Sequence, residues 1–304
     1  MFIPTTPMAM LITWSTLGLV VGSFLNVCIY RWPLEDQTVM NPKRSRCPKC
    51  DRNLHWYENI PVFSWLIQLG KCRGCANSIS YRYPLVELIT AAFWGLSAWV
   101  GEPSNALVAV RVLIFSSLIV ATFIDFDHFL IPDEISIGGM IAAPILCLLM
   151  PQLHEGSAVA IIASGDAAEV TRFGAFTASM AGLAAGGGIL WLIGWLGAKA
   201  YGTDAMGFGD VKLLAAGGGF IGAGGALVAL MIASAIGSVV GVFVMIHLFR
   251  RFRSRARKGG HAVSLRFAIA HARKWGRYIP FGPYLAMGIG IVLLYWDHVM
   301  AAFT

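Results

Sequence analysis

Long apolar segments alternate with short polar stretches along the whole chain. Eight of these segments approach the roughly 20 residues that a helix needs to cross a bilayer. We expect them at Met8–Tyr30, Leu85–Val100, Ala106–Ile124, Glu134–Met150, Phe173–Leu196, Val211–Gly224, Ala226–Phe249 and Phe281–Met300. The sixth segment is short and rich in glycine, which favours a tilted or broken helix. The pattern predicts an all-α polytopic membrane protein with about eight transmembrane helices.

Composition supports the same class. The 304-residue chain is 57% hydrophobic and only 13% charged, with a mean hydropathy of +0.68. About a quarter of the residues of an average soluble domain are charged, so an ordinary soluble domain is excluded. The net charge of +7 lies mostly in a few loops. This is typical of a topology signal that also attracts anionic lipid, and we expect membrane lipid but no nucleic acid as a partner.

The basic residues also predict the orientation and the domains. They concentrate between Arg31 and Arg82 and in the stretch after Phe249. Loops rich in lysine and arginine stay in the cytoplasm, so both stretches should lie there. We therefore expect a first transmembrane helix at 1–30, a cytoplasmic loop domain at 31–84 and a seven-helix membrane domain at 85–304. The last contains a basic cytoplasmic loop at about 250–279, whose purpose the sequence does not indicate.

Two aspartates stand at the ends of apolar segments. Asp125 follows the third segment, and Asp210 opens the sixth, 85 positions further along the chain. With the amino terminus outside, the number of crossings places both acids at the cytoplasmic membrane face. Carboxylates at such positions are costly and usually functional. We therefore expect Asp125 and Asp210 to meet.

The loop domain contains two Cys-x-x-Cys pairs about 20 residues apart. They are Cys47 with Cys50 and Cys72 with Cys75. This spacing predicts a tetrahedral four-thiolate zinc site, and in so small a loop the metal would replace a hydrophobic core. Disulfides are the alternative, which a reducing cytoplasm disfavours, and iron could use the same ligands.

Several polar and glycine residues near the ends of the segments allow two interpretations. Asn26, in the first segment, is equally well explained as a packing residue whose amide is hydrogen-bonded within the protein or as a substrate contact. Gly207 and Gly209 would let the backbone pass close to a substrate, or would form a plain turn. Lys212 is either a substrate contact or an anchor at the membrane surface. We take these four as candidate substrate-binding residues.

Three further residues compete for the role of Asp125. Asp127 lies about 200° round a helix from Asp125, so both cannot face one site. We expect Asp127 to be a solvated acid at headgroup level. Asp133 and Glu134 follow a proline and are typical of a helix amino-terminal cap.

Seven motifs occur in an order that resembles the type IV prepilin peptidases over nearly the whole chain. The motifs are Gly22-Ser23-Phe24-Leu25-Asn26-Val27, the two cysteine pairs, Glu58-Asn59-Ile60-Pro61, Arg82-Tyr83-Pro84-Leu85-Val86-Glu87, the stretch from Asp125 to Asp133, Gly207-Phe208-Gly209-Asp210, and Pro280-Phe281-Gly282-Pro283-Tyr284-Leu285-Ala286. Any one of them would be weak evidence, whereas the ordered set is specific.

The resemblance implies an aspartic peptidase of the bacterial inner membrane, with its active site at the cytoplasmic face. Members of this family remove the short basic leader from prepilins or from the pseudopilins of type II secretion systems. The catalytic aspartates of the family fall on Asp125 and on Asp210 of the Gly-x-Gly-Asp motif. Bifunctional members then methylate the new amino terminus with S-adenosylmethionine. They also carry the long metal-binding loop, so we expect both activities here.

The chemistry of two carboxylates agrees with that assignment. Peptide hydrolysis needs one ionised carboxylate and one protonated one, which a close pair achieves by sharing a proton. No nucleotide-binding motif is visible in the sequence, so the S-adenosylmethionine site is unplaced and methylation rests on the resemblance alone.

Three alternatives remain open. The chain could be a peptidase without methyltransferase activity. A proton-coupled transporter would also pair acids in a helical bundle, but with repeats and with the acids near mid-bilayer. A metal-dependent membrane scaffold would keep the cysteines and tolerate loss of Asp125 and Asp210.

Overall fold

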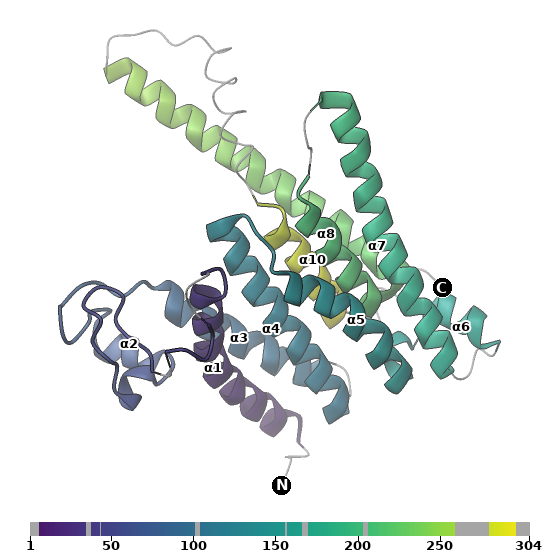
Figure 1. Cartoon of the computed structure of the whole chain (residues 1–304), viewed down its shortest axis with the longest axis horizontal. Coiled ribbons are helices and arrows are strands. Elements are labelled where there is room, and N and C mark those ends of the chain that lie inside the picture. The colour runs from purple at the N-terminus through teal and green to yellow at the C-terminus, as the bar shows by residue number, and fades with distance from the viewer. Residues whose placement is uncertain are drawn as a thin grey trace.

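The computed structural model describes residues 6–34, 38–42, 44–100, 104–155, 157–165, 170–202, 206–258 and 280–295 (Figure 1). These residues form helices and loops and contain no extended strand. The helices are α1 (Pro7–Arg31), η1 (Trp56–Asn59), α2 (Phe63–Ile67), α3 (Arg82–Trp99), α4 (Asn105–His128), α5 (Asp133–Leu149), η2 (Pro151–His154), α6 (Ala158–Ser164), α7 (Arg172–Tyr201), α8 (Phe208–Lys258) and α10 (Gly282–Leu294).

The prediction of an all-α membrane protein is confirmed. Among the described residues, four helices are long and apolar enough to cross a membrane, namely α1, α4, α7 and α8, and α10 is a shorter apolar helix. Every predicted segment falls on a helix. The end of the eighth segment and most of the basic loop at 250–279 lie outside the described residues.

The sixth and seventh predicted segments form one element, α8, that is broken at Gly222. The backbone there has φ 65° and ψ 176°, a conformation that glycine tolerates best. A side chain at Gly218 would lie 3.3 Å from Cβ of Ala226, although eight residues of straight helix span about 12 Å. The chain therefore folds back at Gly222, two residues before the predicted boundary at Gly224, and α8 consists of two arms.

Small residues allow the helices of the bundle to approach closely. Gly182 on α7 and Gly218 on α8 touch each other's backbone, so a methyl group at either position would clash with the carbonyl of the other. Close contact through glycine is how helices associate in a membrane. The core beside this contact joins α4, α8 and α10 through Phe115, Leu214 and Ile289.

The loop domain is fastened to the ends of α1 and α3. Arg31 donates from Nη1 to the carbonyl of Pro42 at 2.7 Å, and the Val62 amide donates to Oε2 of Glu87 on α3 at 2.7 Å. Figure 1 shows the domain beside α1 and α3. Its position relative to the bundle is therefore set by buried polar contacts.

Candidate active site

Asp125 lies in the last turn of α4. The helix continues to His128, four residues past the predicted end at Ile124. It ends there because Phe129 adopts a left-handed conformation, and the Phe129 N–H donates to the carbonyl of Asp125 at 3.0 Å. The Asp125 residue is only 5% exposed. The helix thus holds this carboxyl group inside the bundle.

Asp210 lies in the first turn of α8. Its amide donates to the carbonyl of Gly207 at 3.2 Å, and the residue is 8% exposed. Gly207 immediately precedes the helix, where it forms the turn. Gly209 is already helical, and a side chain there would lie 3.3 Å from Cβ of Ile131. The turn interpretation therefore fits Gly207, whereas Gly209 is a close packing position.

Gly282 and Ile131 join the surroundings of the two aspartates. Gly282 opens α10, and a side chain there would lie 2.5 Å from Oδ2 of Asp125 and 3.0 Å from Cδ1 of Ile131. Ile131 also contacts Gly209, next to Asp210. The structure therefore brings the two acids together where α4, α8 and α10 meet.

One oxygen of this pair is buried without a partner. Oδ2 of Asp125 has no hydrogen-bond partner among the described residues. Such a group is costly unless it carries a proton or contacts a water or substrate atom. Gly282 leaves space above this oxygen, because any larger residue would fill it.

The charged residues two positions from each aspartate pair with other helices. Asp127 forms an ion pair with Arg82, which also donates to the carbonyl of Phe123 at 2.8 Å. Lys212 forms an ion pair with Asp133, the first residue of α5. Asp133 thus forms an ion pair and does not cap α5, because Pro132 occupies the N-cap position of that helix.

Asn26 connects two helices of the bundle. Its Nδ2 donates to the carbonyl of Gly22 at 3.3 Å and to that of Tyr83 at 3.0 Å. These bonds are the partners that a buried amide in a membrane helix requires. A substrate contact by Asn26 stays a prediction, as it does for Gly207, Gly209 and Lys212.

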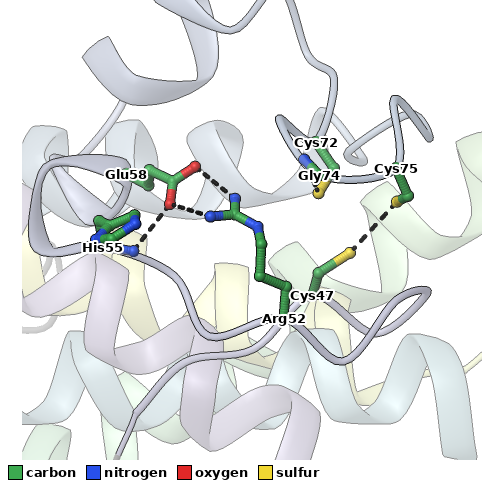
Figure 2. Close-up of polar contacts among 7 residues, drawn as sticks. All are labelled: Cys47, Arg52, His55, Glu58, Cys72, Gly74 and Cys75. Carbon is green, nitrogen blue, oxygen red and sulfur yellow. Dashed lines mark hydrogen bonds and ion pairs between the residues drawn. The ribbon is translucent and has the colours of Figure 1, made fainter.

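The four cysteines of the loop domain gather in one cluster (Figure 2). All four sulfur atoms lie within 4.8 Å of one another, and those of Cys47 and Cys75 are 3.9 Å apart. A tetrahedral zinc ion with Zn–S bonds of about 2.3 Å separates its sulfurs by about 3.8 Å. The cluster therefore fits a four-thiolate metal site.

The two cysteine pairs have the same local structure. The amide of Cys47 donates to the carbonyl of Arg52 at 3.0 Å, and that of Cys72 to the carbonyl of Asn77 at 2.9 Å. The fourth residue after each of these cysteines, Asp51 and Ala76, has a positive φ. Each pair thus forms a tight turn that directs both sulfurs to one side.

Neighbouring N–H groups favour the thiolate form of two of the four cysteines, Cys72 and Cys75. The N–H groups of Cys75 and Gly74 lower the pKa of Cys72 to about 6, and the Gly74 nitrogen is 3.4 Å from its sulfur. Asn77 lowers the pKa of Cys75, and its side-chain nitrogen lies 3.3 Å from that sulfur. Thiolates are the form that binds metal.

Arg52 links the cysteine cluster to Glu58. Figure 2 shows its guanidinium group between the two. It bonds both Glu58 oxygens, at 2.7 and 3.1 Å, and Glu58 accepts a third bond from the His55 amide at 2.8 Å. The Arg52 contact lowers the pKa of Glu58, whose side chain is 1% exposed. The motif analysis did not predict a role for Arg52, because nothing in the sequence pairs it with Glu58.

Fold and sites together define a helical membrane protein with a buried aspartate pair and a separate four-cysteine site. Two family profiles match it, "Bacterial Peptidase A24 N-terminal domain" over residues 16–100 and "Type IV leader peptidase family" over residues 112–242. The first match contains the cysteines and the second both aspartates. The chain belongs to the type IV leader peptidase family.

Relatives named prepilin leader peptidase/N-methyltransferase are similar over most of the chain. The Stutzerimonas stutzeri protein is 32% identical, covering 99% of this chain and 96% of its own length. The Pseudomonas aeruginosa protein is also 32% identical, covering 98% and 94%. The Myxococcus xanthus protein is 39% identical over 76% of this chain and 62% of its own length. No solved structure matches the chain.

Proposed function

We propose that this protein removes the leader peptide from type IV prepilins or from type II secretion pseudopilins by a two-aspartate mechanism. The supporting observation is that Asp125 and Asp210, far apart in the chain, lie together and buried at one end of the bundle. Membership of the leader peptidase family supports the reaction class.

The aspartate pair supplies both functions that hydrolysis needs. The ionised carboxylate takes a proton from a water molecule as the water oxygen attacks the peptide carbonyl carbon. The protonated carboxyl group donates a hydrogen bond and then its proton to the carbonyl oxygen. When the tetrahedral intermediate collapses, the C–N bond breaks and the leaving amine takes a proton from one carboxyl group of the pair. A hydroxyl group of the intermediate returns its proton to the other, so the pair again shares one proton. The unpartnered Oδ2 of Asp125 suits contact with that water or carbonyl.

The active site would lie at the cytoplasmic face of the bacterial inner membrane. A charged leader would remain in the cytoplasm while the apolar helix of the precursor lies in the bilayer beside the enzyme. Cleavage would then fall just before that helix. Asp125 lies in the last turn of α4 and Asp210 in the first turn of α8, and positions at helix ends agree with a site at the membrane face.

The cysteine cluster would hold a structural metal. Cys47, Cys50, Cys72 and Cys75 would bind zinc, or iron through the same ligands, and the ion would stabilise a loop domain with little core. Metal analysis of the purified full-length protein tests this. We expect one ion per chain, lost in Cys47→Ser and retained in the control Cys28→Ser, because Cys28 is packed in α1. Metal-free wild type would contradict the assignment.

The names of the relatives support a second activity, N-methylation of the new amino terminus with S-adenosylmethionine. The alternative is a peptidase alone. Incubation of the full-length enzyme with a pilin precursor and the methyl donor, with product masses measured, distinguishes them. Leader loss with an added methyl group supports both activities, whereas leader loss alone supports the alternative.

The same assay tests the peptidase proposal. Asp125→Asn and Asp210→Asn should each reduce cleavage by at least about 10³-fold, since residues that act as a unit fail together. Asp127→Asn is the matched control, because Asp127 pairs with Arg82, and it should change cleavage by less than about tenfold. Cleavage retained in both catalytic variants would exclude the mechanism and favour a scaffold or transporter.

A further inference from the structure

The loop domain exposes a row of large apolar side chains on α2. Phe63, Leu66 and Ile67 stand at positions i, i+3 and i+4, which share one face of a helix. Leu69 follows directly, and the four side chains are between 53% and 83% exposed. We call these four residues the α2 face. A contiguous apolar surface outside the membrane-spanning helices requires a partner.

The opposite side of α2 is fixed to the domain. Trp65 donates from Nε1 to the carbonyl of Ile79 at 3.1 Å, and its ring lies 2.9 Å from the position of a side chain at Gly70. The Ile79 amide in turn donates to the carbonyl of Gly70 at 2.6 Å. With Trp65 turned inward, the α2 face points outward as part of the folded domain.

The charge around the α2 face is positive. Lys71 and Arg73 follow it directly and are exposed, and Arg73 also lies over the Tyr57 ring at 5.3 Å. Between residues 44 and 81 the acids are Asp51 and Glu58, which pair with Arg46 and Arg52. An apolar row beside unpaired cations matches the surface of an anionic bilayer.

The start of α2 is held against α3, which packs on the membrane-spanning helix α1. Val62 immediately precedes α2, and its amide donates to the buried Glu87, in the second turn of α3. Val62 is a β-branched residue at φ 61°, a conformation that persists only where the surroundings hold it. Glu87 packs against Gly22, in the carboxyl-terminal half of α1. The start of α2 therefore lies beside the carboxyl-terminal half of a helix that is long and apolar enough to span a membrane.

We propose that the α2 face inserts into the headgroup region of the bordering leaflet, with Lys71 and Arg73 on anionic lipid headgroups. The partner is lipid, because position and charge together match a bilayer surface. The lipid contact of the α2 face would then hold the loop domain at the membrane surface, in addition to the hydrogen bond from Val62 to Glu87. This inference depends on the membrane topology and not on peptidase activity.

Photo-crosslinking tests the contact in the full-length protein. The protein is placed in nanodiscs with a phospholipid that carries a photoactivatable group on its acyl chain near the headgroup, and labelled peptides are mapped by mass spectrometry. We expect labelling of residues 63–69 as well as of α1, where Val20 and Phe24 are exposed and serve as the positive control. Labelled α1 with unlabelled 63–69 would overturn the proposal.

Two variants define the contribution of the apolar row. Phe63→Ser/Ile67→Ser should reduce labelling of this peptide at least about tenfold, since burial of these apolar side chains is what holds the α2 face in the bilayer. Met40→Ser removes another exposed apolar side chain of the loop outside α2 and should leave the labelling unchanged. Unchanged metal content verifies that the loop domain stays folded. Equal labelling in both variants would overturn the proposal.

The lipid composition tests the charge. Labelling should rise when anionic lipid replaces zwitterionic lipid, by about fivefold for each of the two cations. Lys71→Gln/Arg73→Gln should remove this rise. If the extent of labelling does not change with the anionic lipid content, the role of the two cations is overturned. Crosslinks from the α2 face to a second copy, or to an added pilin precursor, in place of lipid would assign the surface to a protein partner and overturn the proposal.

Discussion

The four-cysteine cluster and the aspartate pair are assembled in different ways. The cysteines come from two short turns with the same backbone hydrogen bonds, so each half of the site forms from a handful of neighbouring residues. Asp125 and Asp210 come from different helices, and a third helix, α10, completes their surroundings at Gly282. The first site depends on local structure, and the second on the packing of the whole bundle.

The two sites also differ in how charge is treated. The cysteine cluster has Arg52 beside it, and Glu58 balances the charge of this cation. The charged neighbours of the aspartates, Asp127 and Lys212, pair with Arg82 and Asp133 on other helices. A nearby free cation would hold both carboxylates ionised, and the reaction needs one of them protonated. The ion pairs with other helices thus suit proton sharing.

After loss of the aspartates themselves, the largest effect is expected from filling the space at Gly282. Gly282→Ala would place a methyl group 2.5 Å from Oδ2 of Asp125, so the carboxyl group must move. Displacement by about 1 Å can cost about 100-fold in rate, and we expect cleavage to fall by that factor. The matched control is Gly188→Ala on α7, where a side chain would meet nothing within 4 Å. Equal activity in the two variants would show that the space above Asp125 is not used.

A smaller and purely local effect is expected at Glu58. Glu58→Gln removes the charge that Arg52 and the His55 amide contact, at a cost of about 2 kcal/mol. Hydrogen exchange of residues 44–81 should therefore rise about 30-fold, while cleavage changes little. Asp51→Asn is the control, because its pair with Arg46 is exposed, and it should cost less than about 1 kcal/mol.

The same variant has a defined dependence on pH. Arg52 lowers the pKa of Glu58, so the stabilisation is fully present above the ordinary glutamate pKa of about 4.3 and is lost as the pH falls through the lower folded value. The difference in hydrogen exchange between wild type and Glu58→Gln should narrow in acid. A difference that widens there would contradict the assignment of this ion pair.

The smallest effect concerns Lys212 and separates two roles. If the Lys212–Asp133 pair only positions α8 against α5, Lys212→Met and Asp133→Asn should each lower kcat by a few-fold, and the double variant should be no worse. If Lys212 binds substrate, Lys212→Met should raise KM while Asp133→Asn leaves KM unchanged. Steady-state kinetics on a pilin precursor distinguish the two.

The sequence was sufficient for the features that depend on local patterns. Apolar length placed the long helices but not the short α2, α6, η1 and η2, and the Cys-x-x-Cys spacing predicted the cluster because each pair forms its own turn. Counting of crossings placed Asp125 and Asp210 at one end of the bundle without any knowledge of packing. These predictions required only the length of a bilayer and the geometry of a short turn.

The features that depend on contacts between distant residues were not predictable. The end of α4 at His128 depends on the left-handed Phe129, which no apolar pattern encodes. Gly282 belongs to a motif that was recognised, but its role depends on the position of Asp125 in three dimensions. The break at Gly222 was misplaced by two residues because several neighbouring glycines could accommodate it.

The most direct test of the aspartate pair compares the single variants with the double. Cleavage of a pilin precursor is measured for Asp125→Asn, Asp210→Asn and the two together, with metal content as the folding control. If the two carboxyl groups form one catalytic unit, all three variants fall to the same background rate. A single variant that cleaves well above the double, with its product ending at the same new amino terminus, would contradict the account.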